Sequence, residues 1–348
     1  MSSNTLQDPV IEKLRGLVPE IELASRAEVV HEIEALKIQR QALILGHNYM
    51  EPALFNTVPD ITGDSLELCR KAAETTAPVI VFCGVRFMAE TAKILNPERT
   101  VLLPAQVAGC SLAASITAED VRQLRRRYPG VPIVAYINTY ADVKAEVDIC
   151  CTSGNAARVV ESLAGDTVIF LPDEYLARNV ARDTGRHVIL PVMHDSADGP
   201  AFPPDTDIER VMIGWRGRCE VHEQFSVADI ENVRAQFPNT RILAHPECSP
   251  EVTLASDFSG STSEMTAYVR ETEAESFLLL TECSMSDNIA AANPHKTMLG
   301  LCSVRCPHMN EIRLEDVRDS LIHMRQEIFV PEDIRVRALR SVTRMLEL

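Results

Sequence analysis

The chain has 348 residues, of which 46% are hydrophobic and 24% are charged, and its formal net charge is −16. This composition is ordinary for a globular protein, and the length favours two or three domains. The negative charge argues against a nucleic acid or an anionic membrane surface as a partner. It is compatible with anionic substrates, because backbone N–H groups at helix N-termini bind anions without any lysine.

The N-terminal residues and the hydropathy pattern bear on where the protein acts. Residues 1–10 lack the basic and then apolar segments of a secretion signal. No stretch approaches the roughly 18 uncharged apolar residues of a membrane span. We therefore expect a cytoplasmic protein. In that reducing compartment the ten cysteines are not expected to form a disulfide framework, so each is a small buried residue or a metal ligand.

The first part of the chain alternates between strand and helix patterns after a helical segment at 9–38. Apolar residues 42–47 end in glycine and histidine, which is typical of a buried parallel strand. The expected elements are a strand at 42–47, a helix at 65–76, a strand at 79–84, a helix at 87–96 and a strand at 100–104. This alternation indicates an open parallel α/β sheet.

The same alternation recurs twice more along the chain. The second copy has expected strands at 131–137, 167–171 and 187–191 and helices at 154–164 and 173–184. The third has expected strands at 240–244, 276–280 and 296–299 and helices at 262–273 and 284–292. Residues 192–210 read as an inserted loop, and Pro331 divides a helical tail at 313–345.

The repeat length favours three domains over two. We expect an α/β fold of three similar three-layer domains with parallel sheets, related by a pseudo-threefold axis, with the active site at their central junction. The expected divisions are a lead-in at 1–39, units at 40–115, 116–222 and 223–312, and a tail at 313–348.

Polar residues stand at equivalent positions in the three copies. They are His47, Tyr136 and His245, followed two residues later by Tyr49, Asn138 and Glu247. Farther on come Asp60, Asp148 and Asp257, each followed five residues later by a hydroxyl, at Ser65, Ser153 and Thr262. We expect all of them at carboxyl ends of strands, where parallel α/β sheets bind ligands, and this favours a functional role.

One cysteine closes each copy, at Cys110, Cys219 and Cys306, between a strand and a helix. Backbone amides in such loops lower the pKa of a thiol. Three thiolates cannot complete a structural zinc site of four, but they can hold a [4Fe–4S] cube and leave its fourth iron open for Lewis-acid work. Cys302 could compete as a ligand or be redox-active beside the cluster, and we place it outside the ligand set.

The remaining cysteines lie in helices, strands or polar loops. We interpret Cys69, Cys83, Cys150 and Cys151 as packing residues, and we favour a structural role for Cys248 and Cys283 as well.

Several long motifs resemble quinolinate synthase. They are GDSLELCRKAAET, VIVFCGVRFMAETAKILNPERTVLLP, AGCSLA, DICCTSGNA, HPECSPEV, DFSGSTSEM and CPHM, and the similarity runs from about residue 40 to 325. The resemblance implies condensation of iminoaspartate with dihydroxyacetone phosphate, with loss of phosphate and water, to form quinolinate for NAD biosynthesis. It also implies three similar α/β domains around a pseudo-threefold axis, and one [4Fe–4S] cluster per chain, held by Cys110, Cys219 and Cys306.

The resemblance carries over to eleven further positions. They are His47, Tyr49, Ser65, Tyr136, Asn138, Ser153, His222, His245, Glu247, Ser261 and Thr262. We expect Tyr49 and Glu247 to transfer protons and His222 to bind or orient substrate as part of the catalytic group. His47 and His245 are expected on the dicarboxylate, and Tyr136 and Asn138 as hydrogen-bond partners. The serines and Thr262 are expected to bind phosphate at helix starts.

Four departures from the family pattern are Met50 in place of glutamine, Gly154 in place of serine, Arg86, and the basic segment WRGR before Cys219. None removes a predicted cluster ligand or a titrating residue. The family's usual suppliers of iminoaspartate are a flavin-dependent aspartate oxidase or a dehydrogenase.

Two other hypotheses use the same cysteines. One is an iron–sulfur sensor, although the sequence offers no basic stripe or DNA-binding helix. The other is a zinc-dependent aldol-type enzyme that acts on a triose phosphate.

Overall fold

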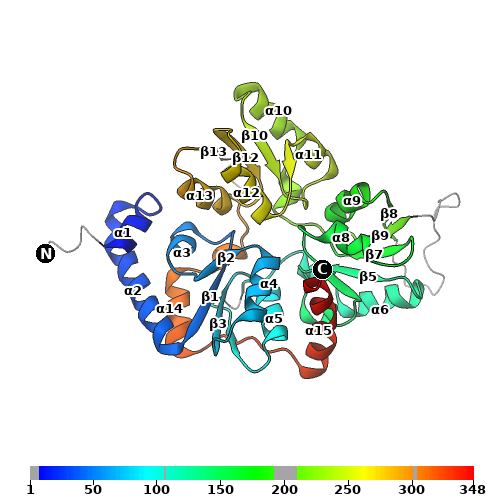
Figure 1. Cartoon of the computed structure of the whole chain (residues 1–348), viewed down its shortest axis with the longest axis horizontal. Helices are drawn as coiled ribbons and strands as arrows, with labels where there is room; N and C mark the ends of the chain where they lie inside the picture. The colour runs from blue at the N-terminus through cyan, green and yellow to red at the C-terminus, as the bar shows by residue number, and fades with distance from the viewer. Residues whose placement is uncertain (1–7, 106, 192–209, 301–303) are drawn as a thin grey trace. The chain divides into compact units, whose positions relative to one another are not determined.

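The computed structural model describes residues 8–105, 107–191, 210–300 and 304–348. It contains three parallel sheets, and Figure 1 labels most of their strands. The first has the order β2 (Ile61–Gly63), β1 (Ala42–His47), β3 (Val79–Cys83), β4 (Thr100–Leu102). The second has the order β6 (Ile149–Cys151), β5 (Ile133–Tyr136), β7 (Val168–Leu171), β9 (Val211–Ile213), β8 (His187–Ile189). The third has the order β11 (Phe258–Ser259), β10 (Arg241–Ala244), β12 (Ser276–Leu280), β13 (Thr297–Leu299).

The predicted α/β fold with three parallel sheets is confirmed. Strands such as β3 and β7 are buried along their whole length, because helices cover both faces of a parallel sheet. The chain forms two compact units, residues 1–109 with 266–329 and residues 110–265 with 330–348. The expected domain boundaries follow the sequence repeats, and they stay a prediction.

Short helices flank these strands in both units. The first unit contains α1 (Pro9–Leu14), α2 (Leu23–Arg40), α3 (Pro52–Thr57), α4 (Ser65–Glu74), α5 (Arg86–Leu95), α13 (Cys283–Ala292) and α14 (Leu314–His323). The second contains α6 (Ala118–Arg127), α7 (Ala141–Lys144), α8 (Ala156–Glu161), α9 (Glu174–Asp183), α10 (Val227–Gln236), α11 (Pro250–Ala255) and α15 (Glu332–Leu346). Helix α12 spans Thr262–Glu271. Within the described ranges, no helix has the length and apolar character needed to cross a bilayer.

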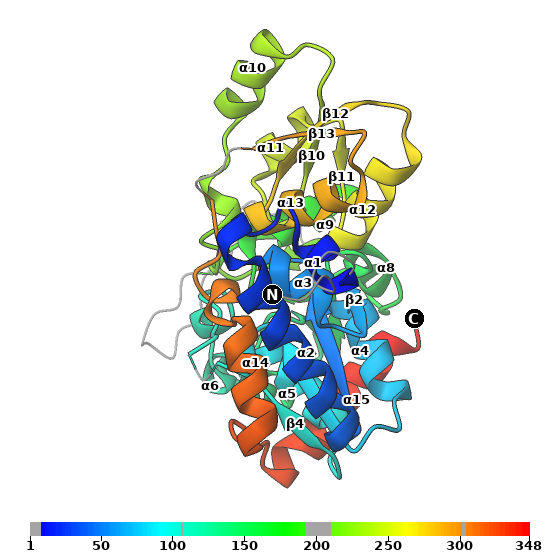
Figure 2. The same cartoon turned by 90° about the vertical axis from the view of Figure 1, so that its left-hand side faces the viewer.

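The terminal helical segments differ in detail from the prediction. The lead-in expected at 9–38 is interrupted between α1 and α2, where Gly16 has a φ of +81° that an L side chain rarely adopts. The tail is divided as expected, and Pro331 is the N-cap of α15. Figures 1 and 2 show α14 alongside α2, where Arg26 and Glu315 form an ion pair of 2.7 Å.

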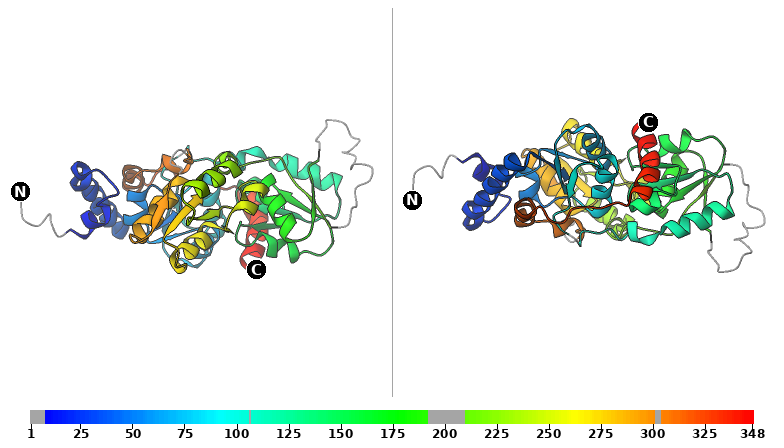
Figure 3. Two further views of the ribbon diagram at one scale, coloured as in Figure 1. Left: turned by 90° about the horizontal axis from the view of Figure 1, so that it is seen from above. Right: turned by 90° about the horizontal axis from the view of Figure 1, so that it is seen from below.

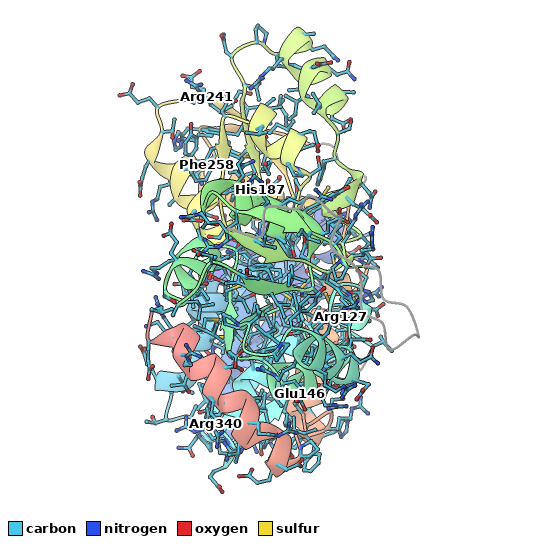
Figure 4. The ribbon with its side chains drawn as sticks, turned by 90° about the vertical axis from the view of Figure 1, so that its right-hand side faces the viewer. Arg127, Glu146, His187, Arg241, Phe258 and Arg340 are labelled. Atoms are coloured by element: carbon cyan, nitrogen blue, oxygen red, sulfur yellow. The ribbon has the colours of Figure 1, made fainter. Side chains whose placement is uncertain are left out.

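Helix α15 packs within the second unit, as Figures 3 and 4 show. Its Ser341 hydroxyl donates to the carbonyl of Lys144 at 2.8 Å, and its Arg337 lies 2.7 Å from Glu146, which Figure 4 labels. The C-terminal segment is therefore part of the fold that supports the second sheet.

Four strands of two or three residues were missed by the sequence reading, although the three-residue strands β4, β8 and β13 were expected. The missed strands are β2, β6, β11 and β9, and β9 separates β7 from β8 in the second sheet. Such short strands carry no measurable periodicity. The loop expected at 192–210 lies outside the described residues except for Arg210.

The three aligned aspartates begin the edge strands and are not at carboxyl ends as expected. Each makes the same two-way contact with a central strand. Asp60 donates its N–H to the Ile44 carbonyl at 2.9 Å, and its carboxylate accepts the Ile44 N–H at 2.9 Å. Asp148 pairs with Ile133 in this way, and Asp257 with Ile242. These carboxylates therefore continue the strand ladder beyond the short edge strand.

This role predicts a stability loss for Asp257→Ala. The variant leaves the Ile242 N–H without its carboxylate acceptor, which lies 2.8 Å away. We expect a loss of about 1–3 kcal/mol in the free energy of unfolding, measured by urea denaturation. Asp257→Asn keeps an acceptor oxygen and should lose clearly less. Equal losses for the two variants would contradict the assignment.

Candidate active site

The turn after the first strand of a repeat has the same form in the first and third copies. The His47 carbonyl accepts the Met50 N–H at 3.0 Å, and its Nδ1 accepts the Tyr49 N–H at 3.2 Å. In the third copy the His245 carbonyl accepts the Cys248 N–H at 2.9 Å, and its Nδ1 lies 3.3 Å from the Glu247 nitrogen. The histidine thus shapes the turn that carries the residue two positions later.

In the second copy Tyr136 takes the histidine position at the end of β5. The carbonyl of Tyr136 accepts the Thr139 hydroxyl at 3.1 Å, and the Thr139 N–H donates to Ile137 at 2.8 Å. The turn is again closed by local hydrogen bonds, and it carries Asn138.

Glu247 is the centre of the polar group in the second unit, and it is only 3% exposed. His222 Nδ1 lies 2.8 Å from one carboxylate oxygen of Glu247, and Asn138 donates its amide N–H to the other at 3.3 Å. The rings of His222 and His245 stack with centroids 4.6 Å apart. Ser153 Oγ lies 3.3 Å from His245 Nε2. Five predicted site residues are therefore in one connected network.

Both rings face the Glu247 carboxylate through Nδ1. His222 Nδ1 lies 2.8 Å from one carboxylate oxygen, and His245 Nδ1 lies 3.3 Å from the same oxygen and 3.3 Å from the Glu247 backbone nitrogen. His245 Nε2 lies on the other side of its ring, 3.3 Å from Ser153 Oγ. Burial by itself raises the pKa of Glu247, but the charge of His222 and the hydrogen bonds of both histidines outweigh it and lower that pKa. Glu247 is thus a carboxylate.

The loops that carry the three cysteines are held in the same way. The first N–H of a helix donates to the carbonyl two residues before each cysteine. The pairs are Arg86 to Ala108 at 2.8 Å, Glu174 to Gly217 at 2.8 Å and Cys283 to Val304 at 3.1 Å. A 3-10 turn follows three residues after each cysteine, at Ala113–Ser115, His222–Gln224 and Met309–Glu311. A ten-residue helix begins eight residues after each cysteine, at Ala118, Val227 and Leu314.

Cys219, His222 and Glu247 could hold a metal ion, because their ligand atoms all lie within 4.8 Å of one another. Burial raises the pKa of the Cys219 thiol well above its usual value, and the charges of Glu247 and Cys110 raise it further. Two predicted cluster ligands are therefore close neighbours in the second unit. A cation would relieve this gathering of anionic groups.

Cys306, the third predicted ligand, is half-buried in the first unit. The buried Glu282 carboxylate accepts its backbone N–H. The amide of Asn310 donates to the Cys306 carbonyl at 2.8 Å and to Glu282 at 3.3 Å. The sequence reading missed Glu282 and Asn310, although Glu282 stands in register with Asp173 as the cap of the corresponding helix.

Asp173 is a second missed residue, fully buried at the start of α9. One of its oxygens accepts the Leu176 N–H, and the other has no hydrogen-bond partner in the part of the chain described. Burial raises the pKa of Asp173 well above its usual value, and the charge of Glu247 adds to this. A protonated Asp173 therefore avoids a second buried charge near Glu247.

The other predicted cysteines and hydroxyls take varied positions. Cys69, Cys83, Cys150, Cys151 and Cys248 are buried, as expected of packing residues, and burial raises the pKa of Cys83 to about 12. Cys283 is half-buried, and Cys302 lies outside the described residues. In the first unit, Ser65 is the first residue of α4, and Tyr49 Oη lies 2.5 Å from Thr281 Oγ1.

Ser261 and Gly154 approach each other in the second unit. Ser261 forms a local cap with Glu264, whose N–H donates to Ser261 Oγ at 3.3 Å, and Thr262 begins α12. A Cβ on Gly154 would lie 3.3 Å from Ser261 Oγ, which is a tight contact. The glycine that departs from the family pattern thus allows close approach between two loops that carry predicted phosphate ligands.

The chain matches known proteins along most of its length. The family model described as quinolinate synthetase A protein matches residues 31–347, a range that includes all the predicted site residues. Quinolinate synthase 2 of Mesorhizobium japonicum is 50% identical over 96% of each chain. Quinolinate synthase of Sinorhizobium fredii is 48% identical over 97% of this chain and 87% of the relative. Quinolinate synthase of Xylella fastidiosa is 50% identical over 93% of this chain and 89% of the relative.

The fold and the site thus define an α/β enzyme in which a buried histidine and carboxylate lie close to Cys219. The chain belongs to the quinolinate synthase family.

The histidine–carboxylate pair predicts an unusual titration in metal-free protein. Burial lowers the pKa of His222 below its ordinary 6.5, although Glu247 partly offsets this. Glu247→Gln removes that offset, so we expect the His222 midpoint to fall further, as measured by NMR of the imidazole. A midpoint that rises in the variant would contradict the pairing. Because the unfolded chain binds the proton first, this histidine lowers the stability as the pH falls below 6.5.

Proposed function

We propose that this protein condenses iminoaspartate with dihydroxyacetone phosphate, with loss of phosphate and water, to form quinolinate for NAD biosynthesis. The observation that carries the proposal is the buried Glu247 carboxylate, held by His222 and Asn138 beside Cys219. Membership of the quinolinate synthase family supports the choice of reaction. A flavin-dependent aspartate oxidase or a dehydrogenase is the proposed source of the iminoaspartate.

The chain's own residues would divide the work of binding and proton transfer. Glu247 would accept a proton as a carboxylate, and His222 would keep it oriented through the 2.8 Å contact. Ser153, Ser261 and Thr262 would donate to the phosphate, together with the helix starts beside them. His245 and Asn138 would bind the dicarboxylate next to Glu247.

In the first unit, His47 and Tyr49 would act on the same substrates, with Ser65 as a further phosphate donor. The Tyr49 hydroxyl is held 2.5 Å from Thr281 Oγ1, and the His47 and Tyr49 rings meet edge to face at 4.8 Å. Such a fixed phenol can give or take a proton at a defined point. Tyr136 would complete the set of hydrogen-bond partners.

One [4Fe–4S] cluster per chain is the proposed cofactor, with Cys110, Cys219 and Cys306 as its ligands. Soft thiolates suit iron–sulfur clusters, and the equivalent loops of the three cysteines support a shared role. When bound, the cluster would supply a Lewis acid at an iron without a protein ligand, which assists loss of water.

The test of the function is an anaerobic assay. Protein purified without oxygen should contain about four irons and four sulfides per chain, as the proposed cofactor requires. It should form quinolinate from iminoaspartate and the triose phosphate. Iron and sulfide without product would favour the sensor hypothesis.

A zinc enzyme is the second candidate, because Cys219, His222 and Glu247 are placed to bind a single ion. Zinc accepts this mixture of thiolate, imidazole and carboxylate ligands. A colourless protein with about one zinc per chain would favour it.

Substitution of the cluster cysteines provides a residue-level prediction. Serine at Cys110, Cys219 or Cys306 should remove activity and lower the iron content, because a hydroxyl is a poorer iron ligand than a thiolate. Cys283→Ser is the matched control, since Cys283 is also half-buried but is outside the ligand set. Full activity and iron in any of the three variants would exclude that cysteine.

Glu247→Gln separates the acid–base role from metal binding. We expect turnover to fall by roughly 10²-fold or more while the cluster's visible absorption stays intact. An unchanged turnover would show that Glu247 carries no proton. A parallel loss of bound metal would favour the zinc site that includes Glu247.

A further inference from the structure

Each of the three turns that carry Tyr49, Asn138 and Glu247 is held by one buried donor. In the first turn, Asn288 Nδ2 donates to the Asn48 carbonyl at 3.1 Å and to the Met50 carbonyl at 2.9 Å. These two carbonyls lie immediately before and after Tyr49. One side chain therefore holds both peptide groups that flank a proposed proton carrier.

The second and third turns have the same arrangement with other donors. Lys144 Nζ donates to the Ile137 carbonyl at 2.9 Å and also to the Thr139 carbonyl, which flank Asn138. Asn179 Nδ2 donates to the Pro246 carbonyl at 2.8 Å and the Cys248 carbonyl at 2.9 Å, which flank Glu247. We call these three contacts the carbonyl clamps.

The donors are buried to a degree that is unusual for their residue types. Lys144 is 0% exposed, and Asn179 and Asn288 are each 3% exposed. A buried polar side chain is costly unless hydrogen bonds satisfy it. The clamps satisfy these donors and, in return, fix the two peptide planes around each site residue. The direction of its Cα–Cβ bond is then fixed as well.

The amide groups of the two asparagines are themselves oriented. Thr253 on α11 donates its hydroxyl to Asn179 Oδ1 at 2.9 Å, and Arg182 donates to the same oxygen at 3.1 Å. Asn56 on α3 donates to Asn288 Oδ1 at 3.4 Å. With Oδ1 engaged as an acceptor, the NH₂ group of each asparagine must face the turn.

The two asparagines stand at equivalent positions of the internal repeat, and the first copy has a threonine there. Asn179 and Asn288 stand six residues after the helix caps Asp173 and Glu282 (173 + 6 and 282 + 6). Six residues after the corresponding cap Val85 (85 + 6) is Thr91, whose hydroxyl donates within its own helix to Phe87 at 2.7 Å. That position therefore holds no amide.

Lys144 stands eight residues after Tyr136, where the third copy has Thr253, eight residues after His245 (136 + 8 and 245 + 8). In the third copy Thr253 reaches its turn through Asn179. The longer lysine side chain reaches the carbonyls directly. Ser341 of α15 anchors the Lys144 carbonyl at 2.8 Å. The contact is thus kept in the three copies, although the donor changes.

We propose that Asn288, Lys144 and Asn179 are positioning residues, which set the direction of Tyr49, Asn138 and Glu247 through the carbonyl clamps. The kinetic consequence rests on the proposed function, whereas the ordering of the turns does not. None of the three donors needs to touch the substrate. Their effect on rate would come from geometry, since a displacement of about 1 Å can cost on the order of 10²-fold.

The first experiment measures amide hydrogen exchange in the full chain, with no substrate. Asn288→Ala should speed exchange in residues 47–51 by on the order of tenfold, and leave residues 245–249 as in the wild type. Asn179→Ala should do the reverse. Asn96→Ala is the matched control, because Asn96 is also buried and donates to two carbonyls, those of Ala72 and Ala92, away from the turns.

The control defines what a general loss of packing does. If Asn288→Ala speeds exchange no more at 47–51 than Asn96→Ala does, the proposal is overturned.

Lys144→Met removes the second clamp, and Lys144→Arg keeps donors at that position. Should Lys144→Met fail to fold, the two asparagine variants still decide the matter. Exchange at 136–140 should be closer to wild type with arginine than with methionine.

The second experiment measures steady-state kinetics on the anaerobic enzyme. Asn288→Ala and Asn179→Ala should lower kcat by about 10–100-fold with a smaller change in KM, and Asn96→Ala should stay within about twofold of the wild type. Loosened turns with wild-type kcat would overturn the positioning role. If the wild-type enzyme makes no quinolinate, the proposed function is wrong. The exchange data would still test the carbonyl clamps.

Discussion

The site depends on one constraint, which is that backbone leaving a parallel sheet at its carboxyl end loses its ladder hydrogen bonds. The structure meets this constraint with buried donors. Helix N–H groups hold the carbonyls before the three cysteines, and Asn288, Lys144 and Asn179 hold the turns. Loops that would otherwise be mobile are thereby fixed, and polar side chains on them acquire defined directions.

Electrostatics gives the second unit its chemical character. The buried Glu247 carboxylate is stabilised by the Asn138 amide, which donates to it, and by His222 Nδ1, which lies 2.8 Å away. Burial and the charge of Glu247 raise the pKa of nearby Asp173, which favours its protonated form. Cys110 and Cys219 add further negative character when they ionise. Such a gathering favours a cation, and a soft one where thiolates are the ligands. The proposed cluster and the zinc alternative would both supply such a cation, and they differ in whether Glu247 is a ligand.

Much of the α/β fold could be predicted from the sequence, and several of the polar residues that it singled out lie together around Glu247. Apolar runs and helix caps predicted the strand at 276–280 and the helices that the structure shows as α9 and α13. The threefold register of the repeat singled out His47, Asn138 and Glu247. The strands β2, β6, β9 and β11 could not be found, since segments of two or three residues carry little periodicity. The strands β4, β8 and β13 are as short, but they were found because their apolar residues recur in the aligned half-repeats. Asp60 and its counterparts looked functional by register, but their carboxylates extend the ladder because the edge strands are short.

The sequence by itself determined the α/β class, the threefold repeat and the residues at its equivalent positions, because these depend on local pattern and on spacing. Only the tertiary structure decided that His222 faces Glu247 and that Asn179 and Lys144 do equivalent work. The physical reason is that a buried donor must find acceptors in space, and these can come from chain segments far away. Asn179 lies on α9, yet it holds a turn more than sixty residues later, and no local pattern encodes such a partnership.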